Sequence, residues 1–112
     1  IVYLSGAGIV HIDHVVSLSN AWQTGMFQRT TEERWIFAND PLNLMAVNGP
    51  LNMQKGDGDT ATWLPPLKSY RCEFVARQIA VKVEYQLWLT VPEKEAMLRI
   101  LKACPSQVLP TR

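Results

Sequence analysis

Both histidines of the chain fall in one short segment, on either side of an aspartate. The segment "HIDHVV" contains His11, Asp13 and His14 at the end of a run rich in β-branched residues. A neutral imidazole, with an ordinary pKa of about 6.5, can take a proton from water at neutral pH. A carboxylate is a ligand for hard divalent cations. The segment therefore predicts proton-transfer or metal chemistry, and the rest of the chain must supply the remaining groups.

Two asparagines further along the chain are candidates to complete such a site. Asn43 lies in "LNLMAV", and Asn52 lies in "LNMQK". Carboxylate and amide oxygens suit Mg²⁺ or Mn²⁺, and Mg²⁺ usually keeps several waters and takes substrate phosphate as a further ligand. Two protein ligands are therefore enough. His11 shares a strand face with Asp13, so it is either a third ligand that shifts the preference towards Zn²⁺ or a structural residue.

The first third of the chain predicts two strands followed by two helices. Residues 1–16 are β-branched and interrupted by glycine, which is typical of two short strands. A short helix is expected to start at Ser17 or Ser19 and to end at Gly25. Thr30 and Glu33 then have the spacing of a capping box for a second helix that stops before the next proline.

The middle of the chain predicts a strand and a helix that carry the two asparagines. Residues 42–47 are a strand candidate that contains Asn43, and Pro50 suits the first turn of a short helix that carries Asn52 and ends near Gly56. Adjacent residues on a regular strand face opposite sides, so we expect the strand to end or bulge where Asp13 meets His14.

Two amphipathic helices are expected in the last third. Residues 69–86 have an apolar stripe at helical spacing with Ser69 as the cap, and Thr90 with Glu93 predicts a capping box for a helix over residues 90–104. The basic residues of the first helix form no single stripe, so we expect them on an exposed face: Arg71, Arg77 and Lys82. The tryptophans are expected to pack in the core or at hinges: Trp22, Trp35, Trp63 and Trp88.

Bulk properties set limits on the protein class. The 112 residues carry a net charge of +1 and are 47% apolar, which fits one domain over residues 1–112 with a modest core. The sequence contains no run of about 18 apolar residues, so it predicts no membrane span. Cys72 and Cys104 are too few and too widely spaced for a zinc cluster, and they are either two buried thiols or one disulfide.

The order of these parts resembles the HNH nuclease motif, the ββα-metal finger. The pieces "IDHVV", "FANDPLNLMAV" and "LNMQKGD", with "WLPP", "YRCEFVARQIAVKVEY" and "LKAC", are similar to a branch found in small exported bacterial nucleases and modification-dependent restriction enzymes. The resemblance covers about residues 9–104. It implies an α+β fold, with the finger at about residues 9–57 and a helical part at about 67–104.

The resemblance also implies a role for each candidate residue. Asp13 and Asn52 would hold one divalent ion, most simply Mg²⁺ or Mn²⁺ rather than Zn²⁺. His14 would be the general base, and Asn43 would brace the loop between the strands. Lys55 stands where a basic residue commonly faces a phosphate. An exposed position at a solvated helix end is an equally weighted interpretation of this lysine.

The sequence departs from this branch in two ways. Proline commonly follows the "DHVV" segment, and Ser17 stands there in this chain. Members also tend to begin with a longer region that carries further strands, so the chain reads as an N-terminally shortened fragment.

We therefore expect a metal-dependent endonuclease that hydrolyses DNA phosphodiesters with low sequence specificity and strong salt dependence, because no element is typical of a base-reading helix. The resemblance to exported nucleases and a possible Cys72–Cys104 disulfide favour an exported protein, whereas the resemblance to restriction enzymes favours the cell interior. Two alternatives stay open: a non-catalytic domain that keeps the fold and binds nucleic acid or protein, and a hydrolase of smaller phosphoesters. The oligomeric state is not predicted.

Overall fold

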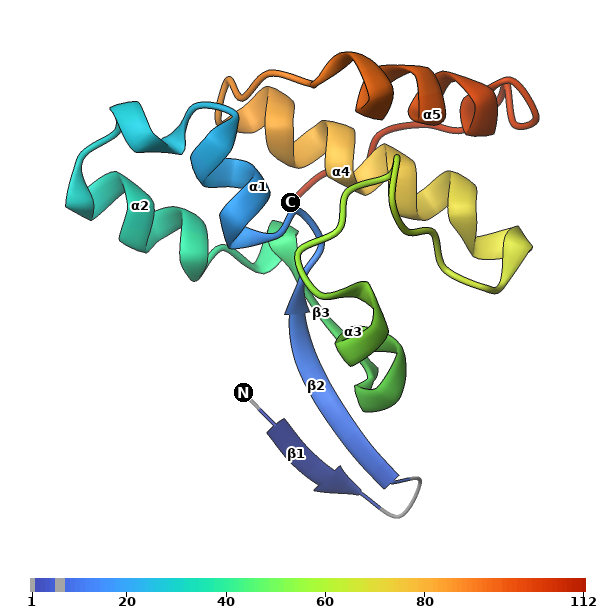
Figure 1. Cartoon of the computed structure of the whole chain (residues 1–112), viewed down its shortest axis with the longest axis horizontal. Coiled ribbons are helices and arrows are strands. Elements are labelled where there is room, and N and C mark those ends of the chain that lie inside the picture. Colours follow the sequence, from blue (N-terminus) through green and yellow to red (C-terminus); the bar gives the residue numbers. More distant parts are fainter. Residues whose placement is uncertain (1, 6–7) are drawn as a thin grey trace.

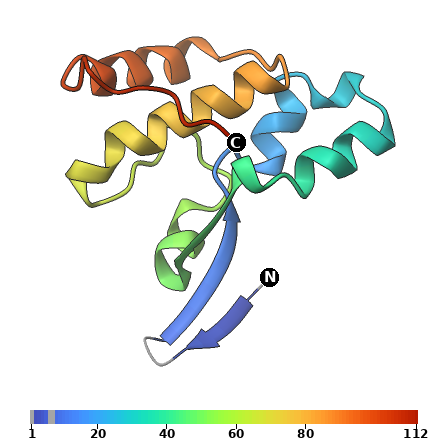
Figure 2. The ribbon, with the colours of Figure 1, turned by 180° about the vertical axis from the view of Figure 1, so that it is seen from behind.

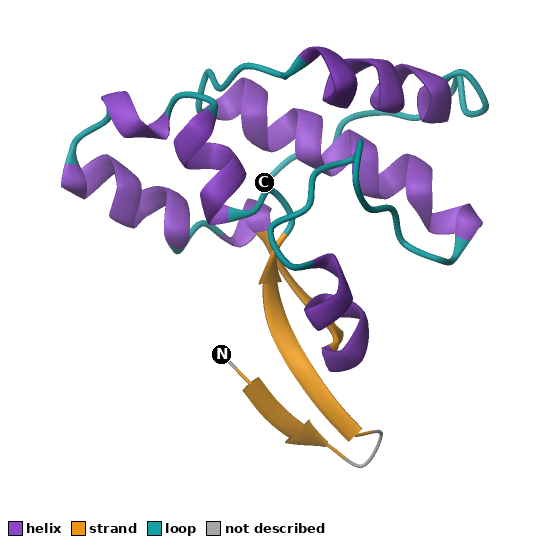
Figure 3. Ribbon diagram, viewed as in Figure 1, coloured by secondary structure: helices purple, strands orange, loops and turns teal. Residues whose placement is uncertain are grey.

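A β-hairpin extends from one side of a layer of helices. The computed structural model describes residues 2–5 and 8–112, with side chains from residue 10 onward. In Figure 1, the helices between the second and third strands lie together with the two C-terminal helices, whereas the strands and one short helix lie below them. Figure 3 shows the same separation by element type, with the strands gathered beneath the helices. The fold is α+β, as expected.

Three antiparallel strands form the sheet in the order β1, β2, β3. They are β1 (Val2–Ser5), β2 (Gly8–His14) and β3 (Leu44–Asn48). Strand β2 is central, and its last residue, His14, pairs with Leu44 at the start of β3. The strand ends at His14, as expected from the alternation of strand faces.

Helix α3 (Gly49–Lys55) follows β3 directly and completes a strand–strand–helix unit. The Asn48 side chain caps it by accepting from the Leu51 N–H, and Pro50 lies in its first turn. Gly56 ends it at φ 54°, a conformation that suits glycine. Helix α3 lies along β2 and β3 in both Figure 1 and Figure 2.

Two helices and two short 3₁₀ turns separate β2 from β3. They are α1 (Leu18–Gln23), η1 (Met26–Gln28), α2 (Thr31–Ala38) and η2 (Pro41–Asn43). Ser17 caps α1, and the predicted Thr30–Glu33 capping box is present at α2. The strand assignment of Asn43 was wrong. Because Pro41–Asn43 form a 3₁₀ turn capped by Asp40, Asn43 ends that turn and β3 begins one residue later.

Helices α4 (Arg71–Glu84) and α5 (Val91–Leu101) form the C-terminal part. The Thr90–Glu93 capping box of α5 is confirmed. Ser69 does not cap α4, because a 3₁₀ turn η3 (Lys68–Tyr70) precedes the helix. A disulfide joins Cys72 to Cys104, which settles the two readings of the cysteines and ties the start of α4 to the segment after α5.

The main apolar cluster lies between α1, α2, η2 and α4. Its members are Val16, Ala21, Met26, Phe37, Leu42, Val81 and Leu87, with Tyr85 packed against them. Two expectations about the surface were wrong. Lys82 is buried because its ammonium pairs with buried Glu93 at 3.0 Å. Trp22, Trp35 and Trp88 are each about half exposed or more, so they do not belong to the core, and Trp63 is less exposed than these three.

The last residues return to the middle of the molecule (Figures 1 and 2). Arg112 donates two hydrogen bonds to the buried carboxylate of Asp40, at 2.6 and 2.5 Å. The same carboxylate accepts from the Tyr85 hydroxyl and from the Leu42 N–H. Asp40 thus ties the turn before β3 to α4 and to the C-terminal segment.

Candidate functional site

Asn43 joins the end of β2 to the turn that precedes β3. Its side chain is fully buried, its Oδ1 accepts from the Val16 N–H at 2.7 Å, and its Nδ2 donates to the Val16 carbonyl at 3.0 Å. Its own carbonyl accepts from the Val15 N–H at 2.9 Å. These bonds fix the residues that directly follow Asp13 and His14, which agrees with a bracing role.

The face of β2 that carries Asp13 meets helix α3 at two pairs of side chains. His11 and Asp13 are two residues apart on the strand, and Asn52 and Lys55 are three apart on the helix, so each pair shares a face. Asn52 Nδ2 lies 2.8 Å from His11 Nδ1, and Lys55 Nζ lies 3.0 Å from Asp13 Oδ2. Asp13 and Asn52 are therefore brought to the same interface.

Lys55 is neither a solvated helix end nor an exposed cation. Its side chain is 2% exposed and that of Asp13 is 14% exposed. Besides its ion pair with Asp13, the ammonium donates to the His14 carbonyl at 2.9 Å. The reading as a solvated helix end was wrong, because α3 packs this position against β2.

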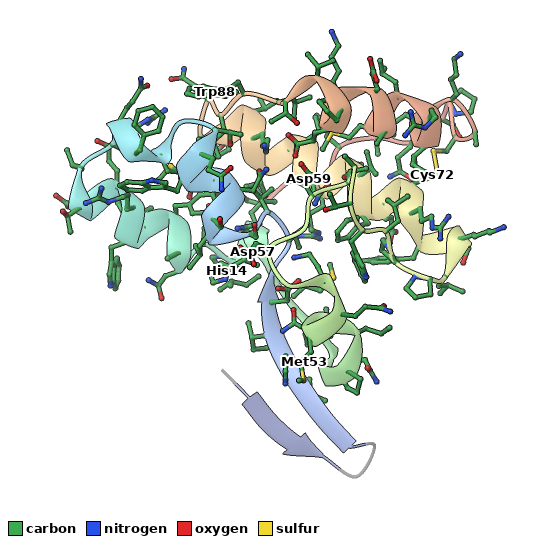
Figure 4. The ribbon with its side chains drawn as sticks, in the orientation of Figure 1. His14, Met53, Asp57, Asp59, Cys72 and Trp88 are labelled. Carbon is green, nitrogen blue, oxygen red and sulfur yellow. A yellow bond between two sulfur atoms is a disulfide. The ribbon has the colours of Figure 1, made fainter. Side chains whose placement is uncertain are left out.

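His14 projects from the opposite face of β2. Its Nε2 lies 2.8 Å from the Ala38 carbonyl oxygen at the end of α2. Because a carbonyl can only accept, Nε2 must carry the proton, and Nδ1 is then the unprotonated nitrogen of the neutral ring. Figure 4 shows His14 at the end of the β2 ribbon nearest the helices. The tautomer is therefore set by a backbone group.

A cavity of about 590 Å³ opens beside the Asp13 carboxylate. Asp13, Asn52 and Lys55 are among its polar lining residues, and much of its wall is apolar. The apolar and aromatic lining residues include Met45, Leu51, Trp63, Leu67, Tyr70 and Phe74. The two proposed oxygen ligands thus reach one solvent-connected space from a strand and a helix.

Sequence reasoning missed a second support for the end of β2. Buried Gln78 of α4 donates from Nε2 to the Val15 carbonyl at 3.0 Å, and its Oε1 accepts from the buried Thr60 hydroxyl. The Ser17 hydroxyl donates to the Asp57 carbonyl at 3.2 Å. The sequence did contain a sign of this support. Gln78 lies among apolar residues of α4, where a buried amide must find hydrogen-bond partners.

The donor chemistry fits a hard divalent ion better than zinc. The Asn52 amide nitrogen is used by His11, which leaves Oδ1 as the atom for a cation, and Asp13 adds carboxylate oxygen. His11 Nδ1 already accepts from Asn52, so it is not free as a third ligand in this arrangement. Across the described residues, no three His, Cys, Asp or Glu side chains gather as a metal-binding group.

Comparison with known protein families finds a match over most of the chain. Residues 3–100 match the family described as GmrSD restriction endonucleases, C-terminal domain. The chain belongs to this family, which is an HNH-like nuclease domain of restriction enzymes. The resemblance inferred from the motifs is thereby confirmed at the level of the family.

A protein of Arthroderma benhamiae, described as an uncharacterized secreted protein, is 45% identical over 102 residues. The match covers 89% of this chain and 50% of that protein, so the chain spans about half the length of this relative. No solved structure matches the chain.

The expectation of an exported protein is confirmed by two findings. The relative is described as secreted, and the Cys72–Cys104 disulfide is of the kind that persists in oxidising compartments. No helix among residues 2–5 and 8–112 is long and apolar enough to cross a membrane.

Proposed function

We propose that the chain is a metal-dependent endonuclease that hydrolyses DNA phosphodiester bonds with low sequence specificity. The observation that carries the proposal is the convergence of Asp13 and Asn52 on one cavity while His14 ends the same strand. An HNH-like nuclease family supports nucleic acid as the substrate class and a divalent ion as the cofactor.

Each residue has a distinct role in this proposal. Asp13 and Asn52 hold a divalent ion, which when bound neutralises the phosphoryl oxygens and stabilises the leaving oxygen. His14 takes a proton from the attacking water at Nδ1, the nitrogen left unprotonated by the Ala38 contact. Asn43 touches no reacting atom and acts as a positioning residue by holding Val16.

Because Asp13 and His14 leave β2 on opposite faces, the scissile group has to lie across the end of the strand. Strand β2 ends at His14, so the regular alternation of faces that separates the two side chains stops there. A phosphate contact by Lys55 would require its ammonium to leave Asp13.

One observation favours a second candidate, a non-catalytic domain that binds nucleic acid or protein. The Lys55 ammonium lies on the Asp13 carboxylate, and it neutralises the charge that an ion would use. If this pair never opens, the fold persists without metal and cannot cut.

The test is incubation of supercoiled plasmid with the protein in Mg²⁺ or Mn²⁺, beside His14→Ala and an EDTA control. The nuclease predicts metal-dependent nicking that His14→Ala loses, with a rate that falls steeply as salt is raised. Unchanged plasmid that is retarded on a gel would support the binding domain instead. Intact, unshifted plasmid with turnover of a small phosphodiester would support a hydrolase of smaller phosphoesters.

A further inference from the structure

Lys55 and Asp13 form the most enclosed ion pair at the candidate site. Their side chains are 2% and 14% exposed, and the ammonium lies 3.0 Å from Asp13 Oδ2. A carboxylate this enclosed needs a nearby positive charge, because burial without one strongly disfavours the charged form. In this structure, that charge is the ammonium of Lys55.

The position of Lys55 on α3 makes it a competitor for the same oxygen. Asn52 and Lys55 are three residues apart and therefore on one face of the helix, towards β2. The helix thus offers one residue that can hold a divalent ion with Asp13 and one residue that repels it. A monovalent ammonium and a divalent ion cannot share Asp13 Oδ2 without strong repulsion at such short distances.

We propose that the Lys55 ammonium is an internal cation that occupies the place of the divalent ion at Asp13. The ion must displace this ammonium to bind, so Lys55 lowers the affinity of the site for metal. This inference rests on the proposed metal site at Asp13 and Asn52. Metal binding moves the ammonium away from Asp13. Its second partner, the His14 carbonyl at 2.9 Å, links that movement to the end of β2, where the proposed base lies. Lys55 is thus a positioning residue and no ligand.

The main experiment compares Mn²⁺ binding to the wild-type chain, Lys55→Met and Lys94→Met, without nucleic acid. Calorimetric titration and thermal unfolding with Mn²⁺ or EDTA provide the readouts. Lys94 is an exposed lysine of α5, so its variant matches the change in net charge at a distant place. Lys55→Met should bind Mn²⁺ at least about tenfold more tightly, and Lys94→Met should bind as the wild type does.

Thermal unfolding gives a second signature. In EDTA, Lys55→Met should unfold at a lower temperature than the wild type, since Asp13 loses its partner. Mn²⁺ should raise its midpoint by more than it raises that of the wild type. Mn²⁺ affinity in Lys55→Met equal to or weaker than in the wild type would overturn the proposal.

A measurement on the wild-type chain keeps the test valid if Lys55→Met does not fold. Lysine acylation followed by mass spectrometry reports the reactivity of Lys55 relative to Lys94. Saturating Mn²⁺ should raise the labelling of Lys55 several-fold, because its ammonium is released from a buried pair. Labelling that stays unchanged would show that the pair does not open, and would overturn the proposal.

The nuclease and the internal cation can fail separately. Plasmid nicking that depends on metal and His14, with a Mn²⁺ affinity that Lys55→Met leaves unchanged, would reject the internal cation alone. Tighter Mn²⁺ binding by Lys55→Met without nicking by the wild type would support the internal cation and reject the nuclease.

Discussion

Asn43 and Val16 exchange two hydrogen bonds, so that one buried amide satisfies both the N–H and the carbonyl of the residue two places after His14. Replacement by alanine would leave both backbone groups buried without partners. We expect Asn43→Ala to lower the free energy of unfolding by about 2–4 kcal/mol. Urea denaturation measures this, with exposed Asn39→Ala as the control. A loss at Asn43 no greater than that at Asn39 would contradict the bracing role.

The buried pair of Lys82 and Glu93 makes a second prediction. The ammonium also donates to the Trp88 carbonyl at 3.0 Å and to the Thr24 hydroxyl at 3.3 Å. Burial lowers the pKa of Lys82, and Glu93 partly opposes this. Lys82→Met should lower the free energy of unfolding by about 3–5 kcal/mol, because it leaves Glu93 buried and unpaired. Adding Glu93→Leu should recover part of this loss in urea denaturation, whereas strictly additive losses would argue against a coupled pair.

The disulfide predicts a stability that depends on redox conditions. Cys72 and Cys104 are 32 residues apart in sequence, and a closed loop of this length is worth about 3–4 kcal/mol in the chain-entropy account. Dithiothreitol should lower the midpoint of thermal unfolding, and the Cys72→Ser/Cys104→Ser variant should be insensitive to it. An equal response of both proteins would rule out this explanation.

The lowered pKa of Asp40 predicts that the fold becomes less stable in acid. The hydrogen bonds from Arg112 are the main cause that lowers the pKa of Asp40 from 3.8 to about 2, despite its burial. A folded-state pKa below the unfolded value stabilises the fold above pH 4, and this contribution is lost as the pH falls from about 4 to 2. The charged Asp40 contributes about 2 kcal/mol at most to the free energy of unfolding, since the Arg112 side chain is half exposed and screened by solvent.

Arg112→Ala tests this assignment. The variant should be less stable than the wild type at pH 7, and the difference should shrink as the pH approaches 2. Chemical denaturation at several pH values measures both, with Arg99→Ala as an exposed control. A difference that stays constant between pH 7 and pH 2 would mean that Arg112 acts through something other than the Asp40 charge.

Local signals in the sequence predicted much of the fold. The capping boxes at Thr30 and Thr90 are determined by residues within one helical turn, so they could be read directly from the chain. The start of α4 could not, because the turn Lys68–Tyr70 displaces the helix from Ser69. The 3₁₀ turn at Pro41 likewise moved Asn43 out of β3.

The contacts of the candidate site depend on residues distant in sequence, and these were harder to predict. Motif spacing singled out Asp13, His14 and Asn52 as candidates. It contained no information on the Ala38 carbonyl, which sets the tautomer of His14, or on Lys55, whose burial follows from the packing of α3 on β2. Lys82 was misjudged for the same reason, since its partner Glu93 belongs to another helix.

The central claim is that Asp13 and Asn52 hold one divalent ion beside the end of β2. Crystals of the chain grown or soaked in Mn²⁺ would test it by anomalous diffraction. The account predicts a peak about 2.1 Å from an Asp13 carboxylate oxygen and from Asn52 Oδ1, with the Lys55 ammonium displaced. At saturating Mn²⁺, a peak bound elsewhere, or no peak with Lys55 still on Asp13, would contradict it.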